Sequence, residues 1–135
     1  MKPQNDVNVY LVEDSPIMRR VLMELIETTG ATVVGHADTA SAAITDIAAL
    51  HPDAVTIDIS LKKGTGFDVL EAIAINDEGH APVRIVLTNH TSDVYREAAQ
   101  ELGAEHFFDK AVQMRSVVRV LESLTAEQSN RRRAA

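Results

Sequence analysis

The amino-acid sequence predicts an α/β fold, a doubly wound, five-stranded parallel sheet covered by helices on both faces. Short runs rich in β-branched residues alternate five times with segments whose apolar residues recur at helical spacing. Glycine, proline or a capping residue stands at most of the boundaries. Such alternation is typical of βα units with right-handed crossovers, which bury both faces of the sheet. A chain of 135 residues is long enough for one domain of this kind.

The first half of the chain contains three expected strands and two expected helices. Residues 7–12 are a strand-type run, after which Ser15 and Pro16 supply the N-cap and the first position of a helix. Gly30 ends that helix. The next expected elements are a strand at 32–34, a helix at 40–50 and a strand at 54–59.

The second half contains the remaining two strands and three helices. After Gly64 and Gly66, a helix begins at Phe67 and ends before Gly79. The expected elements that follow are a strand at 83–87, a helix at 94–102, a strand at 106–108 and a helix at 114–124. We therefore expect an N-terminal extension at residues 1–6, a single domain at 7–126 and a flexible, polar and basic tail at 127–135.

The composition excludes several classes of protein. The net charge of −7 and the isoelectric point near 5.1 argue against nucleic-acid binding, which needs a basic surface. The absence of cysteine excludes disulfides, thiolate metal sites and cysteine nucleophiles. The apolar runs are shorter than a membrane span, and the polar first residues do not form a signal peptide. We therefore expect a cytoplasmic protein without a membrane partner.

Polar side chains follow the ends of the predicted strands. They are Glu13, Asp14, Asp58, Thr88 and Lys110. Because ligand sites of open α/β sheets lie at the carboxyl ends of the strands, these side chains are expected to share one crevice. Three neighbouring carboxylates repel one another unless a cation binds among them, and oxygen ligands with open positions favour Mg²⁺. A metal-neutralised aspartate is a plausible covalent acceptor of a phosphoryl group, whose oxygens Lys110 and Thr88 could bind.

Four motifs in this order carry a resemblance to a known family. They are VYLVEDS with its acidic pair, AVTIDIS with its aspartate, IVLTN with its threonine and GAEHFFDK with its lysine. On these motifs, residues 7–125 resemble the receiver domain of two-component response regulators. The resemblance implies a flavodoxin-like (βα)5 fold with strand order 2-1-3-4-5.

The resemblance also implies a role for each site residue. Asp58 would accept a phosphoryl group from a histidine kinase or a histidine phosphotransfer protein, and Thr88 and Lys110 would contact that group. Phe107, three residues before the lysine, would be the switch aromatic. The Mg²⁺ ligands would be Glu13, Asp14, Asp58 and the backbone carbonyl of Ser60. The chain would be a phosphoacceptor and not an enzyme, limited to self-phosphorylation from small donors and autodephosphorylation, and a monomer or weak dimer that signals to a downstream protein.

Three positions depart from the family pattern. Lys62 replaces a frequent proline, so we expect a looser and more cationic loop. Asn89 replaces a small residue after the threonine and is expected to narrow access to the acyl phosphate. Ala111 replaces a cis-proline after the lysine, so we expect a trans peptide bond or a shifted loop.

Further expectations concern binding surfaces and phosphoryl lifetime. The start of the first helix, with Ile17 next to Arg19 and Arg20, is expected to bind the kinase or phosphotransfer protein. Ser60 and His90, two residues beyond Asp58 and Thr88, are expected to tune dephosphorylation. Inward rotation of Phe107 is expected to carry the signal to a face made by residues 92–102, the fifth strand and the last helix.

Other functions stay open at this stage. A Mg²⁺-dependent aspartyl-phosphate phosphatase or hydrolase would typically have a second aspartate two residues after its nucleophile, where this chain has Ser60. It would also need a cap insertion over its substrate. A pseudo-receiver that binds partners without phosphate, and a receiver fragment of a longer regulator, are further alternatives.

Overall fold

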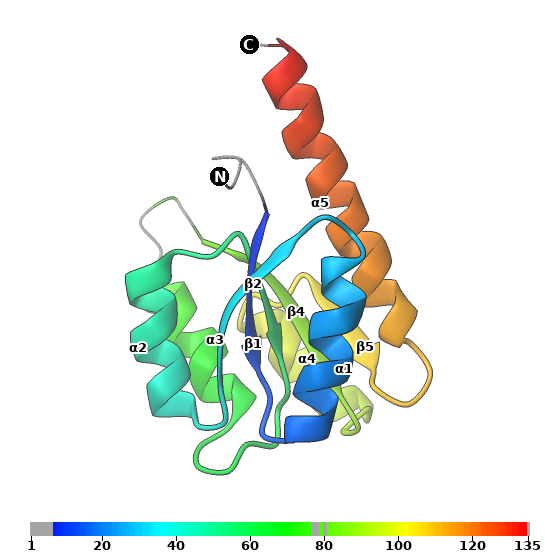
Figure 1. The fold of residues 1–135 in the computed structure, drawn as a ribbon. Coiled ribbons are helices and arrows are strands. Elements are labelled where there is room, and N and C mark those ends of the chain that lie inside the picture. Colours follow the sequence, from blue (N-terminus) through cyan, green and yellow to red (C-terminus); the bar gives the residue numbers. More distant parts are fainter. Residues whose placement is uncertain (1–6, 77–78, 80, 135) are drawn as a thin grey trace.

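The strands and helices alternate along the chain and form one parallel sheet between two layers of helices (Figure 1). This computed structural model describes residues 7–76, 79 and 81–134; the expected N-terminal extension at 1–6 lies outside them. The strands are β1 (Asn8–Val12), β2 (Thr32–Ala37), β3 (Ala54–Ile57), β4 (Val83–Thr88) and β5 (His106–Asp109). The helices are α1 (Pro16–Glu27), α2 (Ala40–Leu50), α3 (Gly66–Ile75), α4 (Asp93–Glu101) and α5 (Met114–Ala134). The order β2-β1-β3-β4-β5 confirms the predicted fold.

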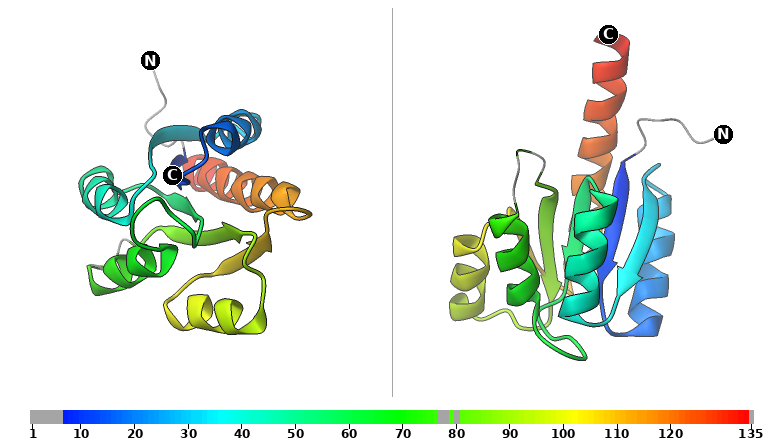
Figure 2. Two further views of the ribbon diagram at one scale, coloured as in Figure 1. Left: turned by 90° about the horizontal axis from the view of Figure 1, so that it is seen from below. Right: turned by 90° about the vertical axis from the view of Figure 1, so that its left-hand side faces the viewer.

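The sheet is buried on both faces. Helices α1 and α5 cover one face and α2, α3 and α4 the other (Figure 2). Alternate strand residues enter opposite layers: Leu11 and Ile85 pack toward α1 and α5, whereas Tyr10 and Val86 pack toward α2, α3 and α4. The β-branched strand runs of the sequence are therefore core on both sides, as the predicted doubly wound sheet requires.

Two strands differ in length from the sequence prediction by more than one residue. β2 continues to Ala37 instead of ending at Val34, because Gly35 and His36 pair with Tyr10 and Leu11 of β1. A Cβ atom at Gly35 would lie 3.0 Å from the Tyr10 ring, so glycine here serves close packing and does not end the strand. β3 ends at Ile57, which leaves Asp58 just beyond the ladder, at the edge of the sheet.

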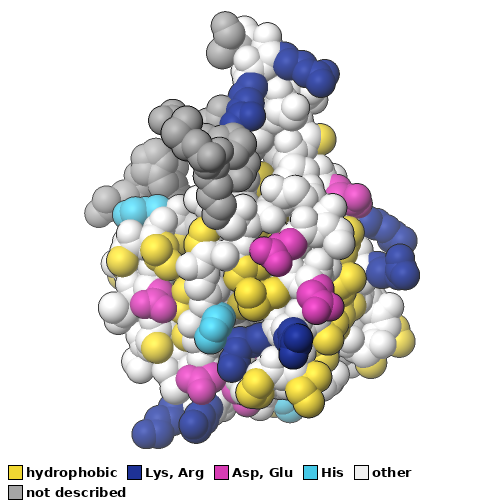
Figure 3. Space-filling view, in the orientation of Figure 1, with side chains coloured by type: hydrophobic (Ala, Val, Ile, Leu, Met, Phe, Trp, Pro, Cys, Tyr) yellow, Lys and Arg dark blue, Asp and Glu magenta, His cyan; other side chains and the backbone are white. Residues whose placement is uncertain are grey.

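The C-terminal segment is not a separate tail. The prediction of a distinct segment at 127–135 is wrong for its described part, because α5 continues through it to Ala134 and projects beyond the sheet (Figure 1). The segment after Gly103 contains no glycine or proline and is rich in glutamate, glutamine, arginine and alanine, which are strong helix formers. Arg131, Arg132 and Arg133 fall in the last turn, where basic side chains complement the helix dipole (Figure 3). Among the described residues, none of the helices combines the length and hydropathy of a membrane span.

Thr56 of β3 contains a buried hydroxyl without a hydrogen-bond partner among the described residues. It alternates with Val55 and Ile57 and faces the apolar layer under α1 and α5. Since a buried, unpaired hydroxyl costs free energy and valine has nearly the same shape, we expect Thr56→Val to raise the free energy of unfolding by about 1 kcal/mol. Urea denaturation monitored by circular dichroism checks this; a loss of stability would show that the hydroxyl has a partner.

Candidate functional site

The polar side chains predicted at the strand ends lie at one edge of the sheet. Glu13 and Asp14 follow β1, and Asp58 follows β3, the neighbouring strand. Thr88 ends β4 and Lys110 follows β5. Because all strands are parallel, their carboxyl ends meet at this edge, and the residues that follow them lie along it.

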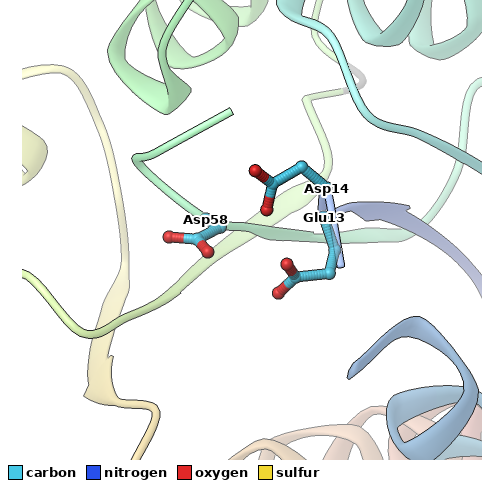
Figure 4. A group of neighbouring side chains, drawn as sticks. All are labelled: Glu13, Asp14 and Asp58. Atoms are coloured by element: carbon cyan, nitrogen blue, oxygen red, sulfur yellow. The ribbon is translucent and has the colours of Figure 1, made fainter. Parts of the chain in front are cut away.

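Three carboxylates form an acidic cluster at this edge (Figure 4). One oxygen from each of Glu13, Asp14 and Asp58 lies within 4.8 Å of the others. Glu13 is 2% exposed and Asp58 7% exposed, whereas Asp14 faces solvent. An exclusively oxygen donor set that is open on one side suits a hard cation that keeps part of its water shell, so these residues fit Mg²⁺.

Lys110 inserts its ammonium between two of these carboxylates. Its Nζ atom lies 2.5 Å from Asp58 Oδ2 and 2.6 Å from Glu13 Oε1, and its side chain is buried. Burial opposes the charge of the ammonium, but hydrogen bonds to Asp58 and Glu13 outweigh it and raise the Lys110 pKa above its ordinary value. Burial also raises the pKa of the Glu13 carboxyl, and the contacts with Lys110 and the Ser15 amide offset only part of that effect. The ammonium therefore stays charged and supplies a counterion to the acidic cluster.

Backbone hydrogen bonds hold the acidic residues in place. The Glu13 N–H donates to the Ala37 carbonyl at 3.0 Å, and the Arg19 guanidinium donates to the Glu13 carbonyl at 2.9 Å. The Asp58 N–H donates to the Val12 carbonyl at 2.9 Å. The bonds from the Glu13 and Asp58 N–H groups continue the pairing of β1 with β2 and with β3, so the backbone positions of these two residues follow from the register of the sheet.

Backbone hydrogen bonds hold the loop after Asp58 in place, whereas the sequence predicts a looser loop because of Lys62. The Lys62 N–H donates to the Asp38 carbonyl, and the Lys63 carbonyl accepts from the Ala40 N–H, both at 3.0 Å. Thr65 then caps α3 in a reciprocal pair with Asp68. Backbone hydrogen bonds therefore hold this loop against the loop between β2 and α2. This attachment does not need a proline at position 62.

Thr88 lies fully buried beside the acidic cluster. Its Oγ1 atom accepts a hydrogen bond from the His90 N–H at 3.1 Å, which leaves the hydroxyl proton free to be donated elsewhere. The Lys110 N–H donates to the Thr88 carbonyl at 2.9 Å, which joins the backbones of the two residues. The Asn89 side chain is exposed. The peptide bond between Lys110 and Ala111 is trans, as predicted.

Phe107 is already inward in this structure. The sequence prediction starts from an outward rotamer, but Phe107 is 6% exposed and packs with Val86, Ala99 and Ala104. Arg96 of α4 covers the ring, with its guanidinium carbon 4.6 Å from the ring centroid, and donates to the Phe107 carbonyl at 3.3 Å. Phe107 is inward rather than outward because an outward rotamer would have to displace this guanidinium.

The sequence does not predict the ring contacts that Tyr95 makes with His90 and Phe67. Tyr95 of α4 lies against both His90 and Phe67, the second residue of α3. Helical spacing identified α4 through the row Val94, Ala98 and Leu102, of which Val94 is 76% exposed, and Tyr95 falls outside this row. No periodic signal marks a residue whose partners come from other elements.

Comparison with known proteins identifies the family. Residues 9–122 match the family model of the response regulator receiver domain. Over 110 residues the chain is 34% identical to a protein-glutamate methylesterase/protein-glutamine glutaminase of Natronomonas pharaonis, a match that covers 78% of this chain and 30% of that protein. The match thus spans less than a third of that relative's length.

Solved structures agree. A LuxR-family two-component response regulator from Aurantimonas sp. SI85-9A1 is 28% identical, with a TM-score of 0.81 over 90% of this chain and 86% of that one. The receiver domain of a sensor histidine kinase from Pseudomonas aeruginosa PAO1, solved with a magnesium ion in its active-site cleft, is 21% identical, with a TM-score of 0.76 over 87% and 98% of the two chains. Because the family model matches residues 9–122 and the expected side chains lie at one sheet edge, the chain belongs to the receiver domains of two-component response regulators.

Proposed function

We propose that this receiver takes a phosphoryl group onto Asp58 in a Mg²⁺-dependent reaction. The observation that carries the proposal is the shared ammonium of Lys110, which lies within hydrogen-bond distance of both Asp58 and Glu13 beside an open oxygen donor set. A phosphoryl group on Asp58 brings several negative charges into a buried site, and it needs such a cation and a metal to be stable there.

Each residue has a defined role in the proposed step. A carboxylate oxygen of Asp58 attacks the phosphorus atom of the donor and forms the P–O bond of an aspartyl phosphate. The bond from phosphorus to the donor's leaving atom breaks, and the leaving group keeps the electron pair and takes up a proton from solvent. Lys110 and the Thr88 hydroxyl bind phosphoryl oxygens, one as a charge and one as a hydrogen-bond donor.

The proposed metal site consists of Glu13, Asp14, Asp58 and the backbone carbonyl of Ser60. A bound Mg²⁺ would neutralise the carboxylates and withdraw charge from the phosphoryl oxygens. The Lys110 ammonium, which contacts Asp58 directly, would supply a further positive charge to a phosphoryl group there. Asp14, exposed at the edge of the site, is the carboxylate that an arriving hydrated ion meets first.

A hydrolase that turns over phosphate esters is the competing function. The Ser60 N–H donates to Asp58 Oδ1 at 3.3 Å, and no second carboxylate stands at this position to protonate a leaving group. We therefore expect phosphoryl uptake of one equivalent per chain without catalytic turnover of a simple phosphate monoester. Continuous release of inorganic phosphate from such an ester, lost in Asp58→Asn, would favour the hydrolase.

The start of α1 is the proposed docking surface for the phosphodonor protein. Ile17 is 78% exposed on α1, and Val112, 79% exposed, follows Lys110 on the loop before α5. Both follow strand ends that form the acidic edge, so their apolar side chains flank the site. Arg20 is exposed, whereas Arg19 is engaged with the Glu13 carbonyl and serves the site itself. The partner we propose is a histidine kinase or histidine phosphotransfer protein with an apolar patch next to its phosphohistidine.

Replacing Ile17 with glutamate is expected to reduce phosphotransfer from such a protein at least tenfold. A charge in the centre of an apolar contact has to be desolvated, at a cost of a few kcal/mol. Self-phosphorylation by a small phosphodonor should not change, because Ile17 is not part of the acidic cluster. Equal loss with both donors, or no loss with the protein donor, would contradict the assignment; Ile75→Glu, equally exposed at the end of α3, is the matched control.

The proposed output face consists of α4, β5 and the first turns of α5. Phe107 connects this face to Thr88 through the pairing of β5 with β4. Because Arg96 holds Phe107 inward, the equilibrium between the two rotamers depends on α4 as well as on the phosphoryl group. The cytoplasmic location and the monomeric or weakly dimeric state stay predictions of the sequence.

A further inference from the structure

The turn between β5 and α5 carries Lys110 into the acidic cluster (Figure 1). Asp109 is the last residue of β5 and lies opposite Thr88 of β4. The Lys110 N–H donates to the Thr88 carbonyl at 2.9 Å, and α5 begins at Met114. The position of the Lys110 backbone therefore depends on how this short turn is held.

Two side chains of the turn accept hydrogen bonds from its own backbone. The Ala111 N–H donates to Asp109 Oδ1, and the Asp109 N–H donates to Gln113 Oε1, both at 2.8 Å. The Gln113 N–H donates in return to the Asp109 carbonyl, also at 2.8 Å. We refer to Asp109 and Gln113 as the turn pair. Its hydrogen bonds hold the backbone on both sides of Lys110.

The turn pair supplies what neither the sheet nor a proline supplies here. β5 is an edge strand, and the N–H of Lys110 points to β4, so the N–H of Asp109 points to the open side of the strand. Gln113 Oε1 accepts a hydrogen bond from this N–H, as a neighbouring strand would. Residues 110–113 contain no proline, so no ring restricts the turn, and hydrogen bonds fix its shape.

The Lys110 ammonium has to reach two carboxylates at once. Its Nζ atom lies 2.5 Å from Asp58 Oδ2 and 2.6 Å from Glu13 Oε1. Bonds of this length form only over a narrow range of positions. Burial opposes the ammonium charge, and the carboxylates that raise the Lys110 pKa against it are those of Asp58 and Glu13, not that of Asp109. The turn pair therefore acts on Lys110 through the backbone and not as a charge partner.

We propose that Asp109 and Gln113 are positioning residues for phosphorylation, which hold the turn after β5 so that the Lys110 ammonium meets the acidic cluster and the incoming phosphoryl group. This inference rests on the proposed phosphorylation of Asp58. The chemical step is the one given above, in which the Asp58 carboxylate forms the bond to phosphorus and the leaving group departs with the electron pair. A turn that loses one of its hydrogen bonds lets the ammonium move, which weakens the stabilisation of charge in the transition state.

The test is the rate of phosphorylation by acetyl phosphate with Mg²⁺, followed by intact mass. Gln113→Met and Asp109→Ala each remove one acceptor oxygen of the turn pair. Since each loses a hydrogen bond of ordinary strength, each is expected to slow phosphorylation about three- to tenfold. Gln113→Glu and Asp109→Asn keep an acceptor oxygen and should stay within about twofold of the wild type. Gln100→Met, at an exposed glutamine of α4, is the matched control and should not change the rate.

Two further measurements separate positioning from a general loss of structure. In the background of Lys110→Met, Gln113→Met should slow phosphorylation no further, because it acts through the ammonium that is already missing. The second measurement is ¹⁵N NMR of the unphosphorylated protein without Mg²⁺. The buried, hydrogen-bonded ammonium protons of Lys110 should exchange faster with water in Gln113→Met than in the wild type, and Gln113→Glu should restore slow exchange.

Each outcome supports the inference or overturns it. Wild-type rates in Gln113→Met and Asp109→Ala overturn the positioning role, and so does equal slowing in Gln113→Met and Gln113→Glu. Slower phosphorylation with unchanged exchange of the Lys110 ammonium shows that the turn pair acts by another route, which also overturns it. Absence of any adduct in the wild type overturns the proposed phosphorylation, and this role with it. The NMR comparison, made without phosphorylation, then distinguishes a wrong reaction from a wrong account of how Lys110 is held.

Discussion

Replacing Asp58 with asparagine is expected to abolish phosphoryl uptake. The amide has the same size as the carboxylate but lacks its charge and nucleophilic oxygen, so the covalent step has no acceptor. The amide can still occupy the place between Lys110 and the Ser60 N–H, so the fold should persist. Intact mass after incubation with a small phosphodonor and Mg²⁺ measures the result directly.

The matched control for this variant is Asp93→Asn. Asp93 is an exposed aspartate in the first turn of α4, so its loss changes the net charge by the same amount without entering the acidic cluster. We expect full uptake in this control. An adduct that persists in Asp58→Asn would show that another residue is the acceptor.

Replacing Lys110 with methionine is expected to have the second largest effect, on stability as well as on phosphorylation. The ammonium is the counterion of two buried carboxylates, and removing one partner of a buried ion pair costs about 3–5 kcal/mol. In EDTA the variant should therefore unfold at a markedly lower urea concentration. Mg²⁺ should recover part of the loss, because a bound cation takes over the role of the ammonium.

The same variant separates the two roles of Lys110. Without the competing ammonium, Mg²⁺ should bind more tightly than in the wild type, whereas phosphorylation should be about 100-fold slower because one stabilising charge on the phosphoryl oxygens is gone. Titration calorimetry and intact mass measure these effects. Lys63→Met, at an exposed lysine, is the control. Unchanged stability in EDTA would contradict the counterion role.

The sequence predicts where these polar side chains lie, because their placement depends on strand ends. Asp58 and Thr88 each stand at the end of an apolar run, and parallel pairing then places them at one edge without any detail of side-chain packing. The same holds for Glu13, which follows β1, the neighbour of β3, and for Lys110, which follows β5, the neighbour of β4. The order of the strands came from the resemblance to the family and was not derivable from the periodicity.

What the sequence does not predict depends on contacts between elements. The inward position of Phe107 depends on Arg96, eleven residues away on another element, and the position of His90 depends on Tyr95. The apolar row that predicts α4 begins at Val94, which is 76% exposed, and it gives no sign of the side chains that reach sideways to α3 and β5. The sequence prediction ends α5 too early for the opposite reason: the segment after residue 124 contains strong helix formers, but it lacks the apolar face that would predict a helix.

The most direct test of the proposed function is the mass of the wild-type chain after incubation with a small phosphodonor, once with Mg²⁺ and once with EDTA. We expect a single phosphoryl adduct that forms only with Mg²⁺, because the acidic cluster otherwise repels an anionic donor. Proteolysis of the adduct should place it on the peptide that contains Asp58. An adduct that forms equally in EDTA, or that lies on a peptide without Asp58, would contradict the proposed function.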